Sequence, residues 1–256
     1  MSEDIAGFYN DLAEDYHLIF EDWERSIERQ AGVLGPIIEA RAGQAPLKVL
    51  DCACGIGTQT IGLARRGHRV TASDLSAAAV ARAERETKSR GLDVTFQVAD
   101  MRNLSSLAET GFDVVLAGDN AVPHLLSDDD LGQAMKSIAA VLKPHGTFLA
   151  TIRDYDHLLQ TRPAFQGPTF VSENGKRRIV HQLWDWNENG YALHLYITVE
   201  SGASWIAKHY ATRYRALQRK ELSRSLESSG FCEIEWRLPE ATGLYQSMVI
   251  ARKDAR

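Results

Sequence analysis

The fold is decided by the stretch Val49-Leu50-Asp51-Cys52-Ala53-Cys54-Gly55-Ile56-Gly57-Thr58. The stretch begins with two apolar residues and then has an acidic one, Asp51. Mostly small residues follow as far as Gly57, and a helical pattern begins after them. This order predicts a buried strand that turns sharply, because glycine accepts positive φ and lets the backbone approach a ligand closely. The spacing D-x-A-x-G-x-G differs from the dinucleotide pattern G-x-G-x-x-G, since Thr60 occupies the third glycine's place.

Two later segments with strand patterns also end in acidic residues. Residues 68–73 lead to Asp74-Leu75, and residues 94–98 lead to Asp100-Met101. An acidic side chain at such a strand end is placed to accept hydrogen bonds from both hydroxyls of a ribose. Three acidic strand ends in this order, with the glycine turn, resemble the S-adenosylmethionine site of class I methyltransferases.

That resemblance implies a role for each part of the set. Backbone groups around Ala53 and Gly55 meet the amino-acid end of the cofactor, where a side chain would collide. Asp74 binds the ribose, and Asp100 accepts from the adenine amine while the amide of Met101 donates to a ring nitrogen. The cofactor-binding residues are expected to be Asp51, Ala53, Gly55, Gly57, Asp74, Leu75, Asp100, Met101 and Asp119.

Composition narrows the class of protein. With 256 residues and 44% apolar residues, the chain is long enough for one domain with an elaboration. Its net charge of −5 argues against a nucleic-acid partner. No apolar run approaches the roughly 20 residues of a membrane span, and the acidic N-terminus is unlike a signal peptide. Three cysteines make neither a disulfide framework nor a zinc pattern. A soluble cytoplasmic protein without a metal is therefore expected.

Strand and helix patterns alternate through the middle of the chain. Strands are expected at 47–51, 68–73, 94–98, 112–117 and 146–152, with helices near 58–66, 76–90 and 128–142. Such alternation predicts a parallel sheet covered on both faces, a Rossmann-like, doubly wound α/β fold. Ligands of such sheets bind outside the carboxyl ends of the strands.

The flanking segments have a different character. Residues 176–185, 191–201 and 204–215 alternate apolar and polar side chains, and Glu188-Asn189-Gly190 marks a hairpin turn. We expect a single domain of four segments: an N-terminal helical lid (1–45), the cofactor-binding core (46–153), an antiparallel insertion over the acceptor site (154–215), and a C-terminal helix with a final hairpin (216–256).

Polar residues follow the fourth and fifth strands of the core. Asp119-Asn120 comes directly after an apolar strand and is expected to border the transferred methyl group. His124 is either a base or a histidine bonded to backbone beneath the loop. Arg153 ends the fifth strand, where an unpaired charge is costly. It either pairs with Asp119 or Asp154, or it receives an anionic substrate as a two-pronged fork.

A narrower resemblance covers most of the chain. Asn120 with His124-Leu125, the run Arg153-Asp154-Tyr155-Asp156, and Asn189-Gly190-Tyr191 before an alternating strand look like glycine and glycine/sarcosine N-methyltransferases. In that family the matching asparagine and arginine hold the amino-acid substrate, which implies these roles for Asn120 and Arg153. The loop reads Gly-Asp-Asn where the family has Gly-Asn, and the segment around Phe170 lacks the family's tyrosine.

The resemblance also implies tyrosines around the methyl group. The candidates are Tyr9 and Tyr16 near the N-terminus and Tyr214, or else Tyr210, near the C-terminus. In the N-terminal helix, Arg29 is a candidate for the cofactor carboxylate. Trp23 either lies over the cofactor or joins Ile27 on a core-facing helical face.

The expected activity is transfer of a methyl group from S-adenosylmethionine to a small molecule, with S-adenosylhomocysteine as product. The expected acceptor is the nitrogen of a carboxylate-bearing metabolite such as glycine or sarcosine. Two alternatives stay open. One is an oxygen or sulfur acceptor with His124 as general base, and the other is a cofactor-binding protein without transfer activity. The sequence leaves the oligomeric state undecided.

Overall fold

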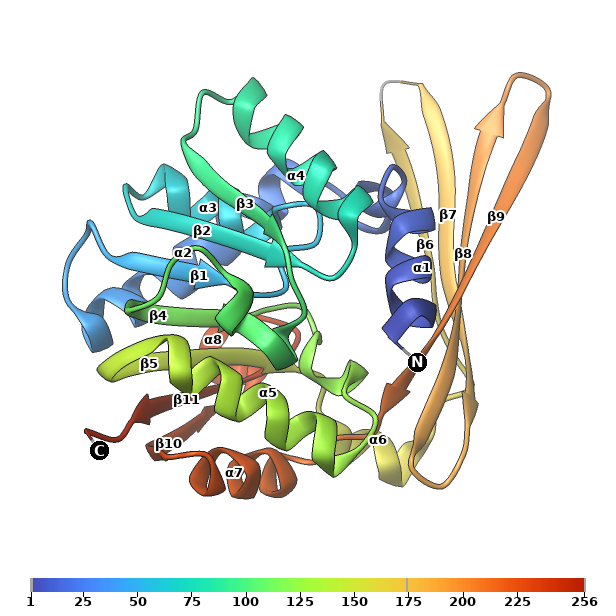
Figure 1. Ribbon diagram of the computed structural model, residues 1–256. Coiled ribbons are helices and arrows are strands. Elements are labelled where there is room, and N and C mark those ends of the chain that lie inside the picture. Colours follow the sequence, from blue (N-terminus) through green and yellow to red (C-terminus); the bar gives the residue numbers. More distant parts are fainter. Residues whose placement is uncertain (1, 174, 256) are drawn as a thin grey trace.

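The computed structural model describes residues 2–173 and 175–255, and it contains two β-sheets (Figure 1). The larger sheet has seven strands in the order β10-β11-β5-β4-β1-β2-β3. Its strands are β1 (Lys48–Asp51), β2 (Arg69–Asp74), β3 (Val94–Val98), β4 (Phe112–Ala117), β5 (Leu142–Ile152), β10 (Phe231–Arg237) and β11 (Ser247–Lys253). The first five pair in parallel, whereas β11 pairs antiparallel with β5 and with β10. The doubly wound α/β fold is confirmed.

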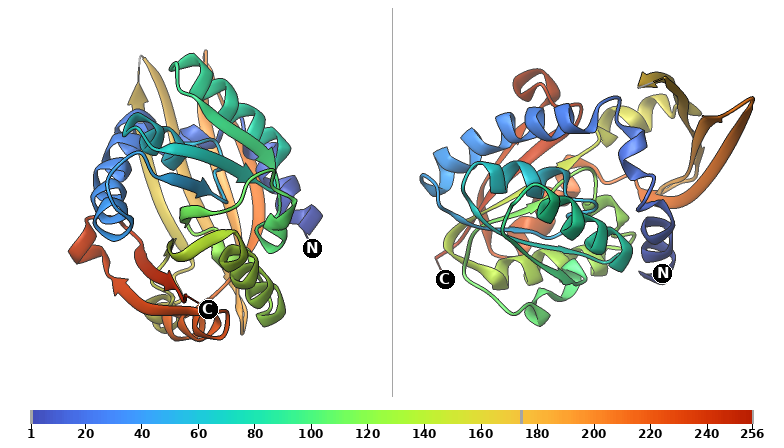
Figure 2. Two further views of the ribbon diagram at one scale, coloured as in Figure 1. Left: turned by 60° about the vertical axis from the view of Figure 1, so that its left-hand side comes forward. Right: turned by 90° about the horizontal axis from the view of Figure 1, so that it is seen from above.

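Adjacent residues of each central strand face opposite layers of helices. Leu50 packs in a core with Leu131 and Ile138 of α5, while Val49 packs with Leu34 of α2. Both strand residues are fully buried, which is why β1 reads as a continuous apolar run. Figure 2 shows the long helix α2 along one face of this sheet. The helices are α1 (Ser2–Leu12), α2 (Trp23–Ala42), α3 (Thr58–Arg65), α4 (Ala77–Ser89), α5 (Asp128–Val141), α6 (Tyr155–Thr161), α7 (Arg219–Ser228) and α8 (Pro239–Thr242).

The smaller sheet is the antiparallel insertion, in the order β6-β7-β8-β9. Its strands are β6 (Phe165–Glu173), β7 (Lys176–Trp186), β8 (Gly190–Ser201) and β9 (Ser204–Arg215). This sheet stands beyond the carboxyl ends of β1, β2 and β4, with α1 between the two sheets (Figure 1). Three short 3₁₀ helices complete the fold: η1 (Tyr16–Ile19), η2 (Met101–Ser106) and η3 (Val122–His124).

Strand β6 and helix α6 are absent from the sequence prediction. Strand β6 contains Gly167-Pro168, a pair that favours a loop. It forms a strand because it lies at the sheet edge and because the pair falls in the irregularity of the register between Gln166 and Thr169, where proline interrupts no regular pairing. The short helix α6 begins after Asp154, whose side chain accepts from the amide of His157 at 3.2 Å. Strand β5 also begins at Leu142 rather than at 146.

No helix in the described ranges is long and apolar enough to cross a membrane. Within residues 2–173 and 175–255, no group of three or more His, Cys, Asp or Glu side chains is arranged to hold a metal ion.

Candidate active site

The loop after β1 is held against the end of β2 by backbone hydrogen bonds. Gly55 has φ 50° and Gly57 has φ 97°, conformations that favour glycine. The amide of Gly55 donates to Asp74 Oδ2 at 2.9 Å, and the amide of Cys54 donates to the carbonyl of Ser73 at 3.0 Å. A Cβ on Gly55 would lie 3.4 Å from the ring of Tyr16. The glycine therefore keeps the space above the loop open.

A first cavity lies over this loop. Among the predicted cofactor-binding residues, those that line it are Ala53, Gly55, Asp74, Leu75, Asp100, Met101 and Asp119. The second oxygen of Asp74 accepts from the amide of Ser76 at 2.9 Å, and burial raises the pKa of this carboxyl. Each carboxylate oxygen can accept more than one hydrogen bond, so Asp74 keeps acceptor capacity toward the cavity.

Two acidic residues of the predicted set are engaged within the protein. Asp100 forms an ion pair with Arg102, whose guanidinium also reaches Asp130. Asp51 lies behind the loop and is fully buried, and its Oδ2 accepts from Thr60 Oγ1 at 2.7 Å. Burial raises the pKa of Asp51 to about 7, and its other oxygen has no partner among the described residues. Gly57 is not among the residues lining the cavity. It begins α3 instead.

The loop after β4 has a strained backbone. Asp119 and Asn120 have φ 49° and 67°, in the left-handed region that residues other than glycine rarely adopt. The amide of Asp119 donates to Thr151 Oγ1 at 2.9 Å, and that of Asn120 donates to the Thr151 carbonyl at 3.0 Å. The loop is thereby fixed to the end of β5, next to Arg153.

Asn120 is buried and connects this loop to Arg153. Its Oδ1 accepts from the backbone amide of Arg153 at 2.9 Å, and its Nδ2 donates to the hydroxyl of Tyr155 at 2.9 Å. Asn120 and Arg153 both line a second cavity, between the larger sheet and the insertion. Tyr9, Tyr16 and Asp119 line the first and the second cavity alike, so the two meet at these side chains.

Arg153 has no carboxylate within 4.0 Å among the described residues. Asp154, one partner considered from the sequence, pairs with Arg219 at 3.3 Å instead. The Arg153 guanidinium donates to Tyr191 and to Gln182 Oε1, and it lies 4.7 Å from the ring centre of Trp184. Two of the five N–H donors of an arginine are thus used. The ion-pair alternative is wrong, and an unpaired cation faces the second cavity.

His124 is held as a neutral side chain. Its Nδ1 lies 3.1 Å from the carbonyl of Arg213, and its Nε2 lies 2.8 Å from the hydroxyl of Tyr9. Since a carbonyl only accepts, Nδ1 carries the proton and Nε2 accepts from Tyr9. Burial, opposed by the Arg213 carbonyl and assisted by the Arg153 charge, lowers the pKa of His124 to about 3. This is the backbone-bonded histidine that the sequence left as one alternative.

Aromatic side chains surround the junction of the two cavities. The rings of Tyr9 and Tyr16 lie 5.9 Å apart, and the hydroxyls of Tyr9 and Tyr214 lie 3.4 Å apart. Tyr210 points elsewhere, because its hydroxyl donates to Asp15. The sequence analysis missed Tyr245, which also lines the second cavity. No local motif marks Tyr245, since it reaches the site only through the pairing of β11 with β5.

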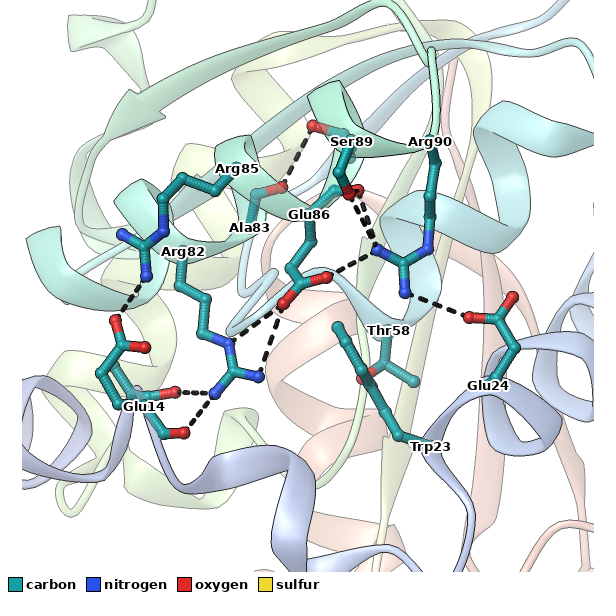
Figure 3. Close-up of polar contacts among 12 residues, drawn as sticks. Glu14, Trp23, Glu24, Thr58, Arg82, Ala83, Arg85, Glu86, Ser89 and Arg90 are labelled. Carbon is teal, nitrogen blue, oxygen red and sulfur yellow. Dashed lines mark hydrogen bonds and ion pairs between the residues drawn. The ribbon is translucent and has the colours of Figure 1, made fainter. Parts of the chain in front are cut away.

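Two arginines hold the chain segment that carries Tyr16. Arg82 of α4 donates to the carbonyls of Ala13 and Glu14 at 2.7 and 2.6 Å (Figure 3). Arg178 of β7 donates to the carbonyls of Leu18 and Phe20 at 3.0 and 2.7 Å. The core and the insertion therefore both fix this segment over the cavities.

The structure does not bring Trp23 to either cavity. Its indole Nε1 donates to Thr58 Oγ1 at 2.9 Å, and the guanidinium carbons of Arg82 and Arg90 lie 5.6 and 5.3 Å from its ring centre (Figure 3). Arg29 is exposed on α2, and its Nη1 donates to the carbonyl of Gly243 at 3.4 Å. Trp23 joins the first turn of α2 to α3 and α4.

Comparison with known proteins agrees with this geometry. Residues 49–146 match the family model described as a methyltransferase domain. The chain is 30% identical over 139 residues to the glycine/sarcosine N-methyltransferase of Parasynechococcus marenigrum, covering 54% of this chain and 48% of that protein. It is 31% identical over 150 residues to the human glycine N-methyltransferase, covering 54% and 50%. The aligned region thus spans about half the length of these curated relatives.

Solved structures resemble the chain over nearly its full length. An S-adenosylmethionine-dependent methyltransferase from Clostridium acetobutylicum superposes with a TM-score of 0.75 at 18% identity, covering 96% of this chain and 99% of that one. CalS10, an amino pentose methyltransferase from Micromonospora echinaspora solved with its cofactor bound, superposes with a TM-score of 0.72 at 20% identity, covering 89% and 91%.

The fold, the glycine loop and the family model together define the class. Residues 49–146 carry a methyltransferase domain, and the chain has the fold of S-adenosylmethionine-dependent class I methyltransferases. The residues that line the first cavity suit that cofactor chemically, because they combine an open glycine turn with a carboxylate that retains acceptor capacity. Within this class, the curated relatives quoted above are glycine and glycine/sarcosine N-methyltransferases.

Proposed function

We propose that the protein transfers a methyl group from S-adenosylmethionine to the nitrogen of a small acceptor that carries a carboxylate. The observation that supports this most strongly is the unpaired guanidinium of Arg153 on the wall of the second cavity. A buried cation without a carboxylate is costly, and a bidentate acceptor carboxylate satisfies its remaining donors. The curated relatives quoted above are glycine and glycine/sarcosine N-methyltransferases, which agrees with this class of acceptor.

Bound cofactor supplies an activated methyl group on a sulfonium. In the first cavity, Gly55 leaves room for the cofactor's amino-acid end, and Asp74 accepts from the ribose. Tyr9 and Tyr16, together with Asp119, border the junction where the acceptor nitrogen meets the methyl group. Arg153 orients the acceptor carboxylate, and Asn120 holds the backbone from which that arginine projects.

The acceptor nitrogen must arrive with its lone pair free. This nitrogen forms the new N–C bond as the S–C bond breaks, the bonding pair returns to sulfur, and the methylated amine releases one proton to solvent. The work of the protein is therefore alignment and exclusion of water rather than strong base catalysis. His124 supplies no base, because its one unprotonated nitrogen already accepts from Tyr9 and its pKa is about 3. The oxygen or sulfur acceptor with a histidine base is disfavoured.

The test is an acceptor panel with cofactor labelled in the methyl group. The panel contains α-amino acids, the corresponding amides that lack the carboxylate, phenols and thiols, and products are identified by mass spectrometry. We expect N-methylated amino acids, with amides methylated at least tenfold more slowly. Equal transfer to amides, or transfer only to phenols or thiols, would contradict the proposal. Tight cofactor binding with no methylated product from any class would instead favour a binding protein.

A further inference from the structure

The second cavity is larger than a glycine acceptor requires. Its volume is about 290 Å³. In this measure one water-sized group needs about 10–15 Å³, so the five heavy atoms of glycine need roughly 50–75 Å³. Because protein sites are packed closely around their ligands, an acceptor as small as glycine or sarcosine leaves most of this cavity to solvent.

Much of the wall is apolar. The apolar residues that line the second cavity are Phe8, Leu12, Ile19, Phe20, Val180, Leu193 and Leu195. They come from α1, from η1 and its end, and from strands β7 and β8. An apolar wall with a few polar groups is the usual construction of a site that binds a partly apolar ligand.

The cross-strand register places this apolar wall beside the head group of Arg153. Gln182, whose Oε1 accepts from Arg153 at 3.4 Å, is paired across β7 and β8 with Leu195. Trp184, whose ring centre lies 4.7 Å from the guanidinium, is paired with Leu193. The residues next to the carboxylate-binding group on the neighbouring strand are therefore two leucines.

We propose that the acceptor is an α-amino acid with a sizeable apolar side chain, and that Leu193 and Leu195 select it. The proposal rests on the proposed function, in which Arg153 holds the carboxylate. When Arg153 binds the carboxylate and the amine lies where the two cavities meet, beside Tyr9 and Tyr16, the side chain of the amino acid lies against Leu193 and Leu195. Each methylene buried there strengthens binding by roughly fourfold.

The first experiment keeps the protein unchanged and varies the acceptor. We measure kcat/KM for glycine, alanine, valine, leucine and phenylalanine with saturating labelled cofactor. We expect kcat/KM to rise along the series, with leucine at least about 50-fold above glycine, because four additional carbons are buried. If glycine or sarcosine is the best acceptor, the inference is overturned while N-methyl transfer to a carboxylate-bearing acceptor still stands. If no amine is methylated, the proposed function itself fails, and this inference fails with it.

The second experiment changes the wall. In Leu195→Asn, we expect kcat/KM for leucine to fall by tenfold or more and that for glycine by less than twofold. The matched control is Ile206→Asn, an apolar residue of the same sheet that is 49% exposed and does not line the cavity. If melting curves show that Leu195→Asn does not fold, Phe20→Ser, which changes a half-buried residue of the same wall, provides the same comparison. A fall that is equal for glycine and leucine overturns the assignment of this wall.

Discussion

The two cavities of this protein are built in different ways. The first is formed largely by the loops that directly follow β1, β2, β3 and β4, and side chains from α1 and η1 complete it. The second combines side chains from α1, from the insertion and from the ends of β4 and β5, which are spread from Phe8 to Gln246. Loops fixed to neighbouring strands of one sheet suit a ligand that stays the same, whereas side chains from several distant elements can vary and so set specificity for the acceptor.

The largest effect is expected where the backbone itself forms the site. In Gly55→Val, cofactor affinity should fall by more than about 100-fold, because φ 50° is unfavourable for valine and the side chain would meet Tyr16. Asp74→Ala should lose roughly tenfold to 100-fold, the cost of one missing polar partner. Calorimetry measures both affinities. Wild-type affinity in both variants would break the assignment of the first cavity.

Arg153→Lys should impair the function of the second cavity and leave that of the first unchanged. Cofactor affinity should stay within about twofold of wild type, since Arg153 lines only the second cavity. Transfer to a carboxylate-bearing acceptor should fall by roughly 2 kcal/mol, because lysine cannot make the two-pronged contact. Steady-state kinetics with an amino acid and with its amide check this. An equal loss for both acceptors, or a loss of folding, would make Arg153 a purely structural residue.

His124 should influence stability rather than the chemistry. Its folded pKa of about 3 lies below the ordinary value of about 6.5. Between these values the unfolded chain binds the additional proton, so the free energy of unfolding should fall by about 1.4 kcal/mol for each pH unit below 6.5. His124→Gln should lack this part of the pH dependence, as measured by denaturant unfolding at several pH values. A histidine-like ionisation in the kcat profile that His124→Gln abolishes would instead restore the base mechanism.

The smallest effect on ligand binding is expected at Trp23. Since its ring lies between Arg82 and Arg90 rather than in a cavity, Trp23→Phe should change cofactor affinity by less than about twofold. It should lower stability by about 1 kcal/mol through the lost hydrogen bond to Thr58. Calorimetry and thermal unfolding report the two quantities. A tenfold loss of cofactor affinity at unchanged stability would show instead that Trp23 takes part in cofactor binding.

The residues that line the first cavity could be predicted largely from sequence, because the signals that mark them are local. The strand that ends at Asp51, the glycine turn and Asp74 lie within a short stretch, and the carboxyl ends of parallel strands meet at one edge. The acceptor side could be predicted only in part. Asn120 and Arg153 follow adjacent strands and come together as expected, whereas Tyr245 and Gln182 reach the cavity through pairings that no local pattern specifies.

The sequence by itself determined the α/β class, the three acidic strand ends and the antiparallel insertion, because periodicity and glycine act within a few residues. Only the tertiary structure decided where the charged and aromatic side chains lie and which partners they bind. It left Arg153 without a carboxylate, held His124 neutral between Tyr9 and a backbone carbonyl, and directed Trp23 away from the cavities. Those outcomes depend on burial and on partners distant in the chain, and both exist only once the two sheets and α1 have packed together.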